Sequence, residues 1–286
     1  MPSDPTEIQT FRHSDGHQVD LRFFVKNGAK ESLLFLPALG VWGSWYDEFL
    51  TDLMEKGINC ICLDWRGQAS SNWRPSRKQD WGYERLVLDC QEVFEYLRSS
   101  FPEHSLSLGG HSLGGQMACL MAARWPQAVS KLVLIATSMV WWRGYSGLMG
   151  IAAWNATWIF PLVANLRGFF PGKSIGFGGK EARTIMKDWG RNGRNGKYLL
   201  HHSDFDYETA FQHLKPDIFA LSFDKDRFVT VRAMDLLIGK IQQPGSVTRF
   251  HETGKAHGFK KLGHFNWVKK PAPWSDMIKK WFEEIS

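Results

Sequence analysis

Ser112 is the residue whose surroundings most clearly indicate chemistry. It is the centre of a Gly-His-Ser-Leu-Gly pattern at residues 110–114, which follows an apolar run at 105–109. A serine on a sharp turn between a strand and a helix has strained backbone angles, so its neighbours must be small, and the two glycines satisfy that need. We expect Ser112 to be a nucleophile, with the Leu113 N–H at a helix N-terminus facing a developing oxyanion. The alternative is an inert serine in a Gly-rich turn.

A serine hydroxyl needs a base and an acid that orients the base. The apolar segment 218–223 predicts a buried strand, and two carboxylates follow it, Asp224 and Asp226. A carboxylate just past a parallel strand lies on the same edge of the sheet as the serine turn. Asp226 is the preferred acid, because a residue in the loop, rather than in the last turn of the strand, must reach the histidine.

His264 is the predicted general base. It lies between Gly263, which permits a sharp loop, and an apolar segment that begins another helix. The order serine, acid, histidine along the chain is then complete. His257 is the most serious rival, because it lies in the same region and is also followed by a glycine. The remaining rivals are His111, His201, His202, His213 and His251.

These motifs resemble those of the α/β-hydrolase superfamily over nearly the whole chain. Residues 33–40 are similar to the family's strand and oxyanion loop, and 58–67 to its strand that ends in Asp-x-Arg-Gly. The resemblance implies an α/β-hydrolase fold: a mostly parallel sheet flanked by helices, with a helical cap after the strand that follows the nucleophile turn. It also implies that Leu39 and Leu113 supply the oxyanion N–H groups, although Pro37-Ala38 replace the frequent His-Gly and leave Ala38 as an alternative to Leu39.

The alternation of apolar periods predicts the order of the elements. Residues 8–26 indicate a hairpin. Strands are expected at 31–36, 58–63, 105–109, 131–136, 218–223 and 247–251, and helices at 43–56, 80–99, 113–125, 231–241 and 272–285. We assign residues 1–137 and 213–286 to the core domain and 138–212 to a helical cap or lid.

The 138–212 segment is expected to determine specificity. It is rich in aromatic residues, and 144–166 contain no charge. The length of that stretch would suit a membrane span, but its glycines, asparagines and Pro161 argue against one. We predict two short cap helices instead, with a lid that opens onto lipid as an alternative. The predicted substrate-binding residues are Trp141, Trp142, Trp154 and Trp158. A Gly-rich stretch followed by a Trp-containing helix also resembles, loosely, an uncharacterised subgroup of predicted hydrolases.

Composition supports a globular protein. The chain has 286 residues, 43% hydrophobic and 22% charged, and a net charge of +6 that is spread along the sequence without a nucleic-acid-binding motif. Its four cysteines are expected to be buried thiols, and no spacing indicates a metal site or a cofactor. The polar residues 1–7 do not fit a signal peptide. We expect a cytoplasmic enzyme.

The predicted activity is that of a serine hydrolase, a carboxylesterase that cleaves an ester with an apolar acyl or alkyl group through an acyl-enzyme. The expected partner is a small-molecule substrate with an apolar moiety, without nucleic acid or a stable membrane span. The alternatives are a thioesterase or acyltransferase, a C–C bond hydrolase, and a ligand-binding protein on a hydrolase scaffold. The sequence does not indicate the oligomeric state.

Overall fold

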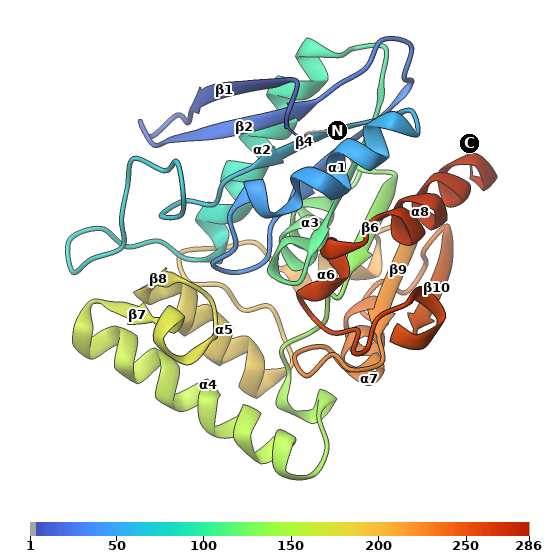
Figure 1. The fold of residues 1–286 in the computed structure, drawn as a ribbon. Helices are drawn as coiled ribbons and strands as arrows, with labels where there is room; N and C mark the ends of the chain where they lie inside the picture. Colours follow the sequence, from blue (N-terminus) through green and yellow to red (C-terminus); the bar gives the residue numbers. More distant parts are fainter. Residues whose placement is uncertain (1–3, 286) are drawn as a thin grey trace.

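The computed structural model describes residues 4–285, so the first three residues of the polar N-terminal segment lie outside the described residues. An eight-stranded sheet with the order β1-β2-β4-β3-β5-β6-β9-β10 forms the centre of the molecule (Figure 1). The strands β3 to β6, β9 and β10 are parallel, and β1 and β2 are antiparallel to their neighbours. The strands are β1 (Glu7–Arg12), β2 (Gln18–Phe24), β3 (Glu31–Leu36), β4 (Ile58–Leu63), β5 (Ser105–His111), β6 (Lys131–Ile135), β9 (Asp217–Phe223) and β10 (Ser246–Glu252).

Helices cover both faces of this sheet. One apolar core joins the sheet to α1 (Asp47–Glu55) and α8 (Ala272–Glu284), and a second core joins its other face to α2 (Tyr83–Ser100), α3 (Leu113–Arg124) and α7 (Val231–Ile238). This is the predicted α/β-hydrolase architecture. The remaining short elements are α6 (Tyr207–Gln212), η1 (Gly43–Tyr46), η4 (Gly254–His257) and η5 (Asn266–Lys269).

Burial on both faces of the sheet explains the apolar composition of the central strands. Every residue of β4 is buried, and all of them except Asn59 are apolar, as a strand covered on both faces requires. Part of the high tryptophan content serves the core behind the sheet, because Trp267, Trp274 and Trp281 are at most 1% exposed. Large aromatic side chains of this kind contribute the most buried apolar area per residue.

The segment between β6 and α6 lies beside the sheet rather than in it (Figure 1). It contains η2 (Trp142–Gly144), α4 (Gly147–Arg167), η3 (Gly172–Ile175) and α5 (Arg183–Asn195). A small antiparallel ribbon of β7 (Phe169–Pro171) and β8 (Lys180–Ala182) completes it.

The prediction of two short helices in the uncharged stretch 144–166 is wrong, because α4 is one helix of 21 residues that spans nearly all of it. Pro161 lies inside it and cannot donate to the carbonyl of Thr157. The Arg194 guanidinium of α5 donates to that carbonyl instead. A partner from another helix therefore satisfies the acceptor that the proline leaves open, and the helix continues.

The turn at Ser112 depends on close contact between β5, α3 and β3. A Cβ on Gly114 would lie 1.9 Å from the Leu36 carbonyl oxygen, and one on Gly110 would lie 2.5 Å from the same atom. Only glycine fits at either position, and the start of α3 therefore packs directly on the backbone of β3.

We predict that Gly114→Ala lowers the free energy of unfolding by about 1–3 kcal/mol, because the backbone must move to admit the methyl group. Gly239→Ala is the control. Its backbone is right-handed helical, and a Cβ there would lie 3.0 Å from the Asp235 carbonyl oxygen. Urea unfolding measures both, and equal stabilities of the two variants would contradict the prediction.

Candidate active site

Ser112 occupies the turn between β5 and α3. Its φ of 56° and ψ of −113° are strained for a residue with a side chain. The Ser112 N–H donates to the Ile135 carbonyl of β6 at 3.0 Å, which holds the turn against the neighbouring strand. The Ser112 hydroxyl lies 3.0 Å from Nε2 of His264.

His264 and Asp226 continue the chain of hydrogen bonds. Nδ1 of His264 lies 2.8 Å from Oδ2 of Asp226, and both side chains are almost completely buried. The other carboxylate oxygen of Asp226 accepts from the N–H groups of Phe228 at 2.7 Å and Val229 at 2.9 Å. These bonds fix the position of the carboxylate.

The loops that carry these two residues support each other. The Lys225 N–H donates to the Leu262 carbonyl at 3.0 Å, and the Asn266 side chain accepts from the Gly263 N–H at 2.7 Å. A Cβ on Gly263 would lie 3.1 Å from the Lys225 carbonyl oxygen. The acid loop and the histidine loop are thus joined directly beside the imidazole.

The rival residues have other contacts. The Asp224 carboxylate accepts from the Gly254 N–H at 3.4 Å and pairs with the neighbouring Lys225. His257 is paired with Glu252 at 2.7 Å. The structure therefore brings Ser112, Asp226 and His264 together and leaves Asp224 and His257 outside this chain of bonds.

The loop after β3 contributes the second amide of the predicted oxyanion site. The Ala38 N–H donates to the Tyr46 hydroxyl at 3.0 Å, and the Pro37 carbonyl accepts from the Trp65 indole at 2.7 Å. Because the Ala38 N–H is occupied, Leu39 is the better of the two alternatives. Leu39 and Leu113 both line the cavity beside Ser112.

Two residues behind the site were not predicted from the sequence. The Tyr46 hydroxyl forms a 2.8 Å hydrogen bond with Nδ1 of His111, and the ring of His111 lies 4.7 Å from the ring of His264. Burial lowers the pKa of His111 well below its ordinary value, so this imidazole is neutral. The sequence signal that could have indicated His111 is its position directly before Ser112.

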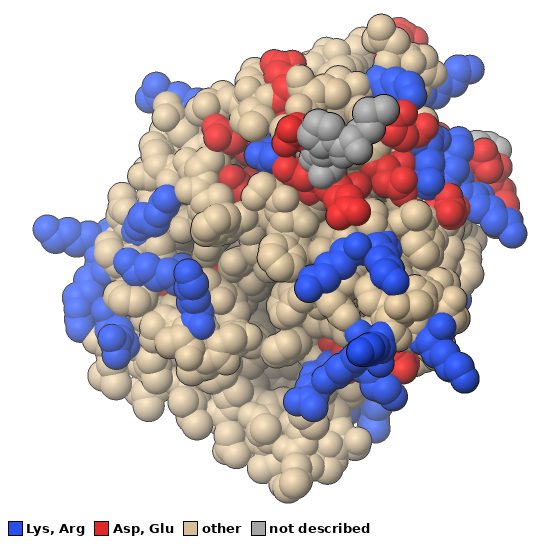
Figure 2. All heavy atoms as spheres, viewed as in Figure 1, with Lys and Arg blue, Asp and Glu red and all other residues tan. Residues whose placement is uncertain are grey.

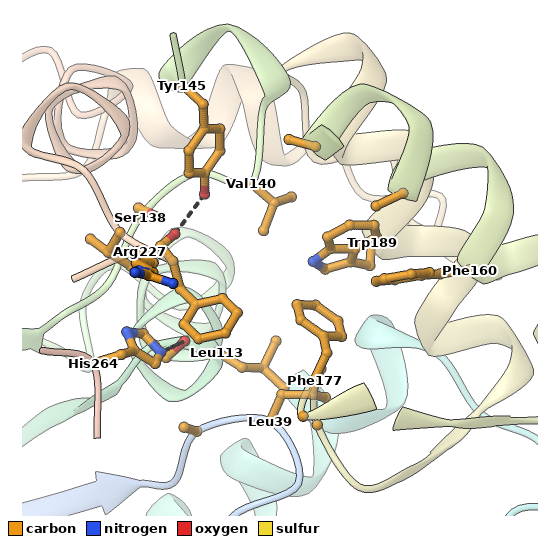
Figure 3. A pocket seen from close by; sticks show the side chains of 18 of the residues that line it. Leu39, Leu113, Ser138, Val140, Tyr145, Phe160, Phe177, Trp189, Arg227 and His264 are labelled. Atoms are coloured by element: carbon orange, nitrogen blue, oxygen red, sulfur yellow. Dashed lines mark hydrogen bonds between the residues drawn. The ribbon is translucent and has the colours of Figure 1, made fainter. Parts of the chain in front are cut away.

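A cavity of about 450 Å³ opens at Ser112 and His264 (Figure 3). Its wall is mostly apolar, and the 138–212 segment supplies much of it. The aromatic and larger apolar residues that line it include Leu39, Val140, Tyr145, Met149, Ile159, Phe160, Phe177, Trp189, Phe228 and Phe265. Such a cavity suits an apolar ligand with few polar groups.

The structure corrects the predicted substrate-binding tryptophans, because none of the four lines this cavity. Trp142, Trp154 and Trp158 form a row of edge-to-face contacts, and the last two are 38% and 55% exposed. Trp141 packs under Gly196 instead. The face of α4 toward the cavity contains small residues such as Ala152, Ala153 and Ala156, because large side chains would fill it.

The charge of the cavity is also informative. Among the described residues that line it, none is acidic, and Arg227 supplies the one guanidinium or ammonium group. Arg227 is exposed at the end of the acid loop (Figure 3). An ammonium group in this cavity would lack a counterion, whereas an anionic group near the entrance would have one.

Three other side chains have the composition of a metal site, namely His13, His17 and Asp89. None of them lines the cavity. Both oxygens of Asp89 already accept from the Arg66 guanidinium, at 2.6 and 2.8 Å. A cation there would compete with a buried guanidinium, so this group is better described as part of an ion-pair network.

Glu181 joins the 138–212 segment to Gln68 in the loop after β4, close to the oxyanion loop. Its carboxylate is buried and accepts from the Gly179 N–H at 2.6 Å and from the Gln68 side chain at 3.3 Å. Gly179 is so close to the oxyanion loop that a Cβ on Gly40 would lie 2.0 Å from its nitrogen. Burial raises the pKa of Glu181 to about 7.

The fold and the arrangement of the site are those of α/β-hydrolases. Residues 28–188, more than half of the chain, match the family described as serine aminopeptidase, S33, and the chain belongs to this family. The matched region contains Ser112 and the oxyanion loop but ends before Asp226 and His264.

Curated relatives align over a smaller part. A putative non-heme haloperoxidase of Mycobacterium phage D29 is 32% identical over 108 residues, 38% of this chain and 36% of that protein. Monoglyceride lipase of Mus musculus is 27% identical over 127 residues, 43% of this chain and 41% of the lipase. The chain thus covers about two fifths or less of the length of these relatives.

Solved structures are similar over the whole chain. A soluble variant of monoglyceride lipase from Saccharomyces cerevisiae has a TM-score of 0.71 at 14% identity, covering 97% of this chain and 95% of that one. The Pyrococcus furiosus esterase Pf2001 has a TM-score of 0.61 at 14% identity, covering 97% and 89%. At these identities the likeness establishes the shared fold.

Glu181 generates a prediction about pH. Its folded pKa of about 7 lies above the ordinary value of 4.5, so the folded state keeps a proton that the unfolded chain releases. The resulting stability is complete below pH 4.5 and is lost as the pH rises through 7. We expect Glu181→Gln to remove about 1–3 kcal/mol of this decline in the free energy of unfolding.

Denaturant unfolding at several pH values measures the decline. Glu95→Gln, on the exposed face of α2, is the control and should keep the wild-type pH dependence. The same decline in the Glu181→Gln protein would show that this carboxyl is not the titrating group.

Proposed function

We propose that this protein hydrolyses carboxylic esters with an apolar acyl or alkyl group. The observation that carries the proposal is the chain of hydrogen bonds from Ser112 through His264 to Asp226, which ends at the wall of an apolar cavity. The similarity to proteins named as a lipase and an esterase agrees with it.

The proposed reaction has two halves. His264 accepts the Ser112 proton as the hydroxyl oxygen bonds to the ester carbonyl carbon, and the bond to the alcohol oxygen then breaks as His264 returns the proton to it. Water, deprotonated by His264, attacks the acyl-enzyme, releases the acid and restores the serine. Asp226 stabilises the imidazolium in both halves, and its two amide contacts keep it in place.

The N–H groups of Leu39 and Leu113 are the proposed oxyanion donors. Such a donor contributes about 3–4 kcal/mol to transition-state stabilisation when it is held in advance at the developing charge. The contacts of Pro37 and Ala38 with Trp65 and Tyr46 would provide that rigidity.

The 138–212 segment is proposed as the cap that selects the substrate. It contributes Met149, Ile159, Phe177 and Trp189 to the cavity, which favours an aliphatic or aromatic group over a polar one. The family description mentions an aminopeptidase, but a substrate with a free α-ammonium would find no carboxylate among the described lining residues. We therefore prefer an ester to a peptide.

An acyl thioester is the second candidate. Arg227, at the entrance, is the observation that favours it, because a phosphate on a long thiol carrier could pair with this guanidinium. The same catalytic residues would serve an acyltransferase or a C–C bond hydrolase. A binding protein would not need the full chain of hydrogen bonds, which counts against that alternative.

A reducing compartment such as the cytoplasm is proposed for the protein. The four cysteines are buried and unpaired. Burial alone raises the pKa of Cys60 and Cys119, so these thiols are unreactive in the fold.

We predict that a fluorophosphonate probe labels the wild-type protein once and that Ser112→Ala abolishes both labelling and ester turnover. The reason is that Ser112 contacts an imidazole held by Asp226 and lines the cavity. Ser32, Ser71 and Ser222 also contact histidines, but none of them lines the cavity. Intact-mass spectrometry counts the label, and nitrophenyl esters of increasing chain length report turnover. Hydrolysis by a folded Ser112→Ala protein would refute the serine mechanism, and labelling without turnover of any ester would favour the thioester.

The acid is tested by a pair of variants. Asp226→Asn should lower kcat/KM about ten-thousand-fold, because the amide favours the wrong imidazole tautomer. Asp224→Asn should leave the rate near that of wild type, since this carboxylate is outside the hydrogen-bonded chain. Steady-state kinetics on one ester compare the two, and the reverse order of losses would reassign the acid.

A further inference from the structure

The outer face of α4 is an exposed apolar stripe. Its members recur at the helical repeat and point away from the protein, and the most exposed, Leu148, is 84% accessible. We define the stripe as Leu148, Ile151, Trp158, Leu162 and Leu166, which are all more than half exposed. An exposed apolar face of this kind, interrupted here by Asn155, marks a place where something binds.

The opposite side of α4 explains why the stripe faces outward. The buried residues Gly150, Thr157 and Ala164 are seven positions apart, so they form one narrow seam. A Cβ on Gly190 or Gly193 of α5 would lie 2.4 or 2.6 Å from atoms of Thr157, so the two helices are in close contact there. The small residues fix the orientation of α4, and its large side chains have no protein to cover them.

Cations surround the stripe. Arg194 lies over the Trp158 ring at 4.0 Å, Arg143 lies over the Trp142 ring at 5.4 Å, and the Arg77 guanidinium donates to the Leu166 carbonyl. Arg167 ends the helix and is exposed. The apolar stripe thus has guanidinium groups on its borders and at its C-terminal end.

The charge balance of this part of the chain is one-sided. Residues 138–203 contain two acidic residues, Glu181 and Asp188, and both are buried. Their nine basic residues are Arg143, Arg167, Lys173, Lys180, Arg183, Lys187, Arg191, Arg194 and Lys197. Asp204, Asp206 and Glu208 follow at the end of the 138–212 segment, which as a whole keeps an excess of four positive charges.

The surface view shows the same asymmetry. Lys and Arg project on both sides of the lower half of the molecule, where α4 lies in Figure 1, and the lowest part is nearly free of charge (Figure 2). Most of the Asp and Glu in this view lie in the upper half.

We propose that the α4 stripe docks on an anionic lipid surface. Its apolar side chains would enter the boundary of the acyl chains, and the surrounding cations would meet the lipid phosphates. A second copy of the chain fits less well, because two α4 faces would bring their arginines together. The helix lies on the membrane in this proposal and does not cross it, since its Gly150–Ala164 seam stays packed on α5.

Docking would place this side of the cavity against the lipid. Met149 and Ile159 line the cavity and are also 45% and 53% exposed beside the stripe. An apolar substrate could then pass from the bilayer to Ser112 without crossing bulk water. This delivery rests on the proposed ester hydrolysis, whereas the docking itself does not.

Vesicle flotation tests the docking. We expect the wild-type protein to bind vesicles of phosphatidylcholine with phosphatidylglycerol at least about tenfold more tightly than phosphatidylcholine alone, and to lose this preference at high salt. The triple variant Leu148→Gln, Leu162→Gln, Leu166→Gln should reduce binding by at least about tenfold. None of its residues lines the cavity, so its turnover of a water-soluble ester and its Tm should remain those of wild type.

Three matched controls sharpen the test. Ile8→Gln changes an exposed apolar residue of β1, 52% accessible, and should bind as wild type. Arg143→Gln with Arg167→Gln should weaken binding to the anionic vesicles, whereas Lys279→Gln with Lys280→Gln on α8 should not. Ser112→Ala should bind fully, which separates docking from hydrolysis.

The proposal is wrong if the wild-type protein does not float with anionic vesicles, or if the triple variant floats as well as wild type. Light scattering tests whether a second copy of the chain occupies the stripe instead. A wild-type dimer that the triple variant converts to a monomer would show that the stripe joins two copies of the chain instead. Vesicle binding without turnover of any ester would refute the proposed function and leave the docking intact.

Discussion

The strained backbone at Ser112 dictates where strand β5 must lie in the sheet. A positive φ at a residue with a side chain is unfavourable, so the surroundings must enforce it. Two strands do so: β6 accepts the Ser112 N–H at Ile135, and the Leu36 backbone of β3 abuts the glycines on either side. The turn can exist only where β5 lies between these two parallel strands, which is the centre of the sheet. The same arrangement brings the loop after β3 beside the serine. It also places the segments that follow β9 and β10, which carry Asp226 and His264, within reach of the serine.

A second layer of contacts then joins the two sides of the site. His111 is the last residue of β5, and it bonds to Tyr46, which in turn binds the Ala38 amide of the oxyanion loop. The ring of His111 also packs against His264. Because burial keeps His111 neutral, it can fill this space without placing a second positive charge beside the imidazolium that forms during the proposed reaction. On the outer side, Gly40 and Gly179 let the oxyanion loop touch the 138–212 segment directly. Movement of that segment would therefore shift the Leu39 amide.

The sequence was most informative where local pattern and global fold impose the same requirement. The apolar periods predicted the central strands and their helices to within a few residues, and chain order selected Ser112, Asp226 and His264, which the structure brings together. It was least informative in the 138–212 segment. Pro161 and several glycines argued for a broken helix, but Arg194 caps the freed Thr157 carbonyl and Gly190 admits the close approach of α5. Both compensations come from a different helix, so no local rule could reveal them. The four tryptophans were misassigned because aromatic content does not show which way a helix faces.

The composition of α4 follows from three demands on one helix. Contact with α5 requires small residues on one side, and the cavity side combines alanines such as Ala152 and Ala156 with larger residues such as Met149. The third side holds the remaining large apolar side chains. A helix whose outer face met only water would gain nothing from leucines and isoleucines there, and polar residues would satisfy the first two demands equally well. The exposed stripe therefore cannot be explained by the packing of the molecule alone. Its arginine borders, and the neighbouring Met149 and Ile159 that line the cavity, connect it to the route by which an apolar molecule would reach Ser112.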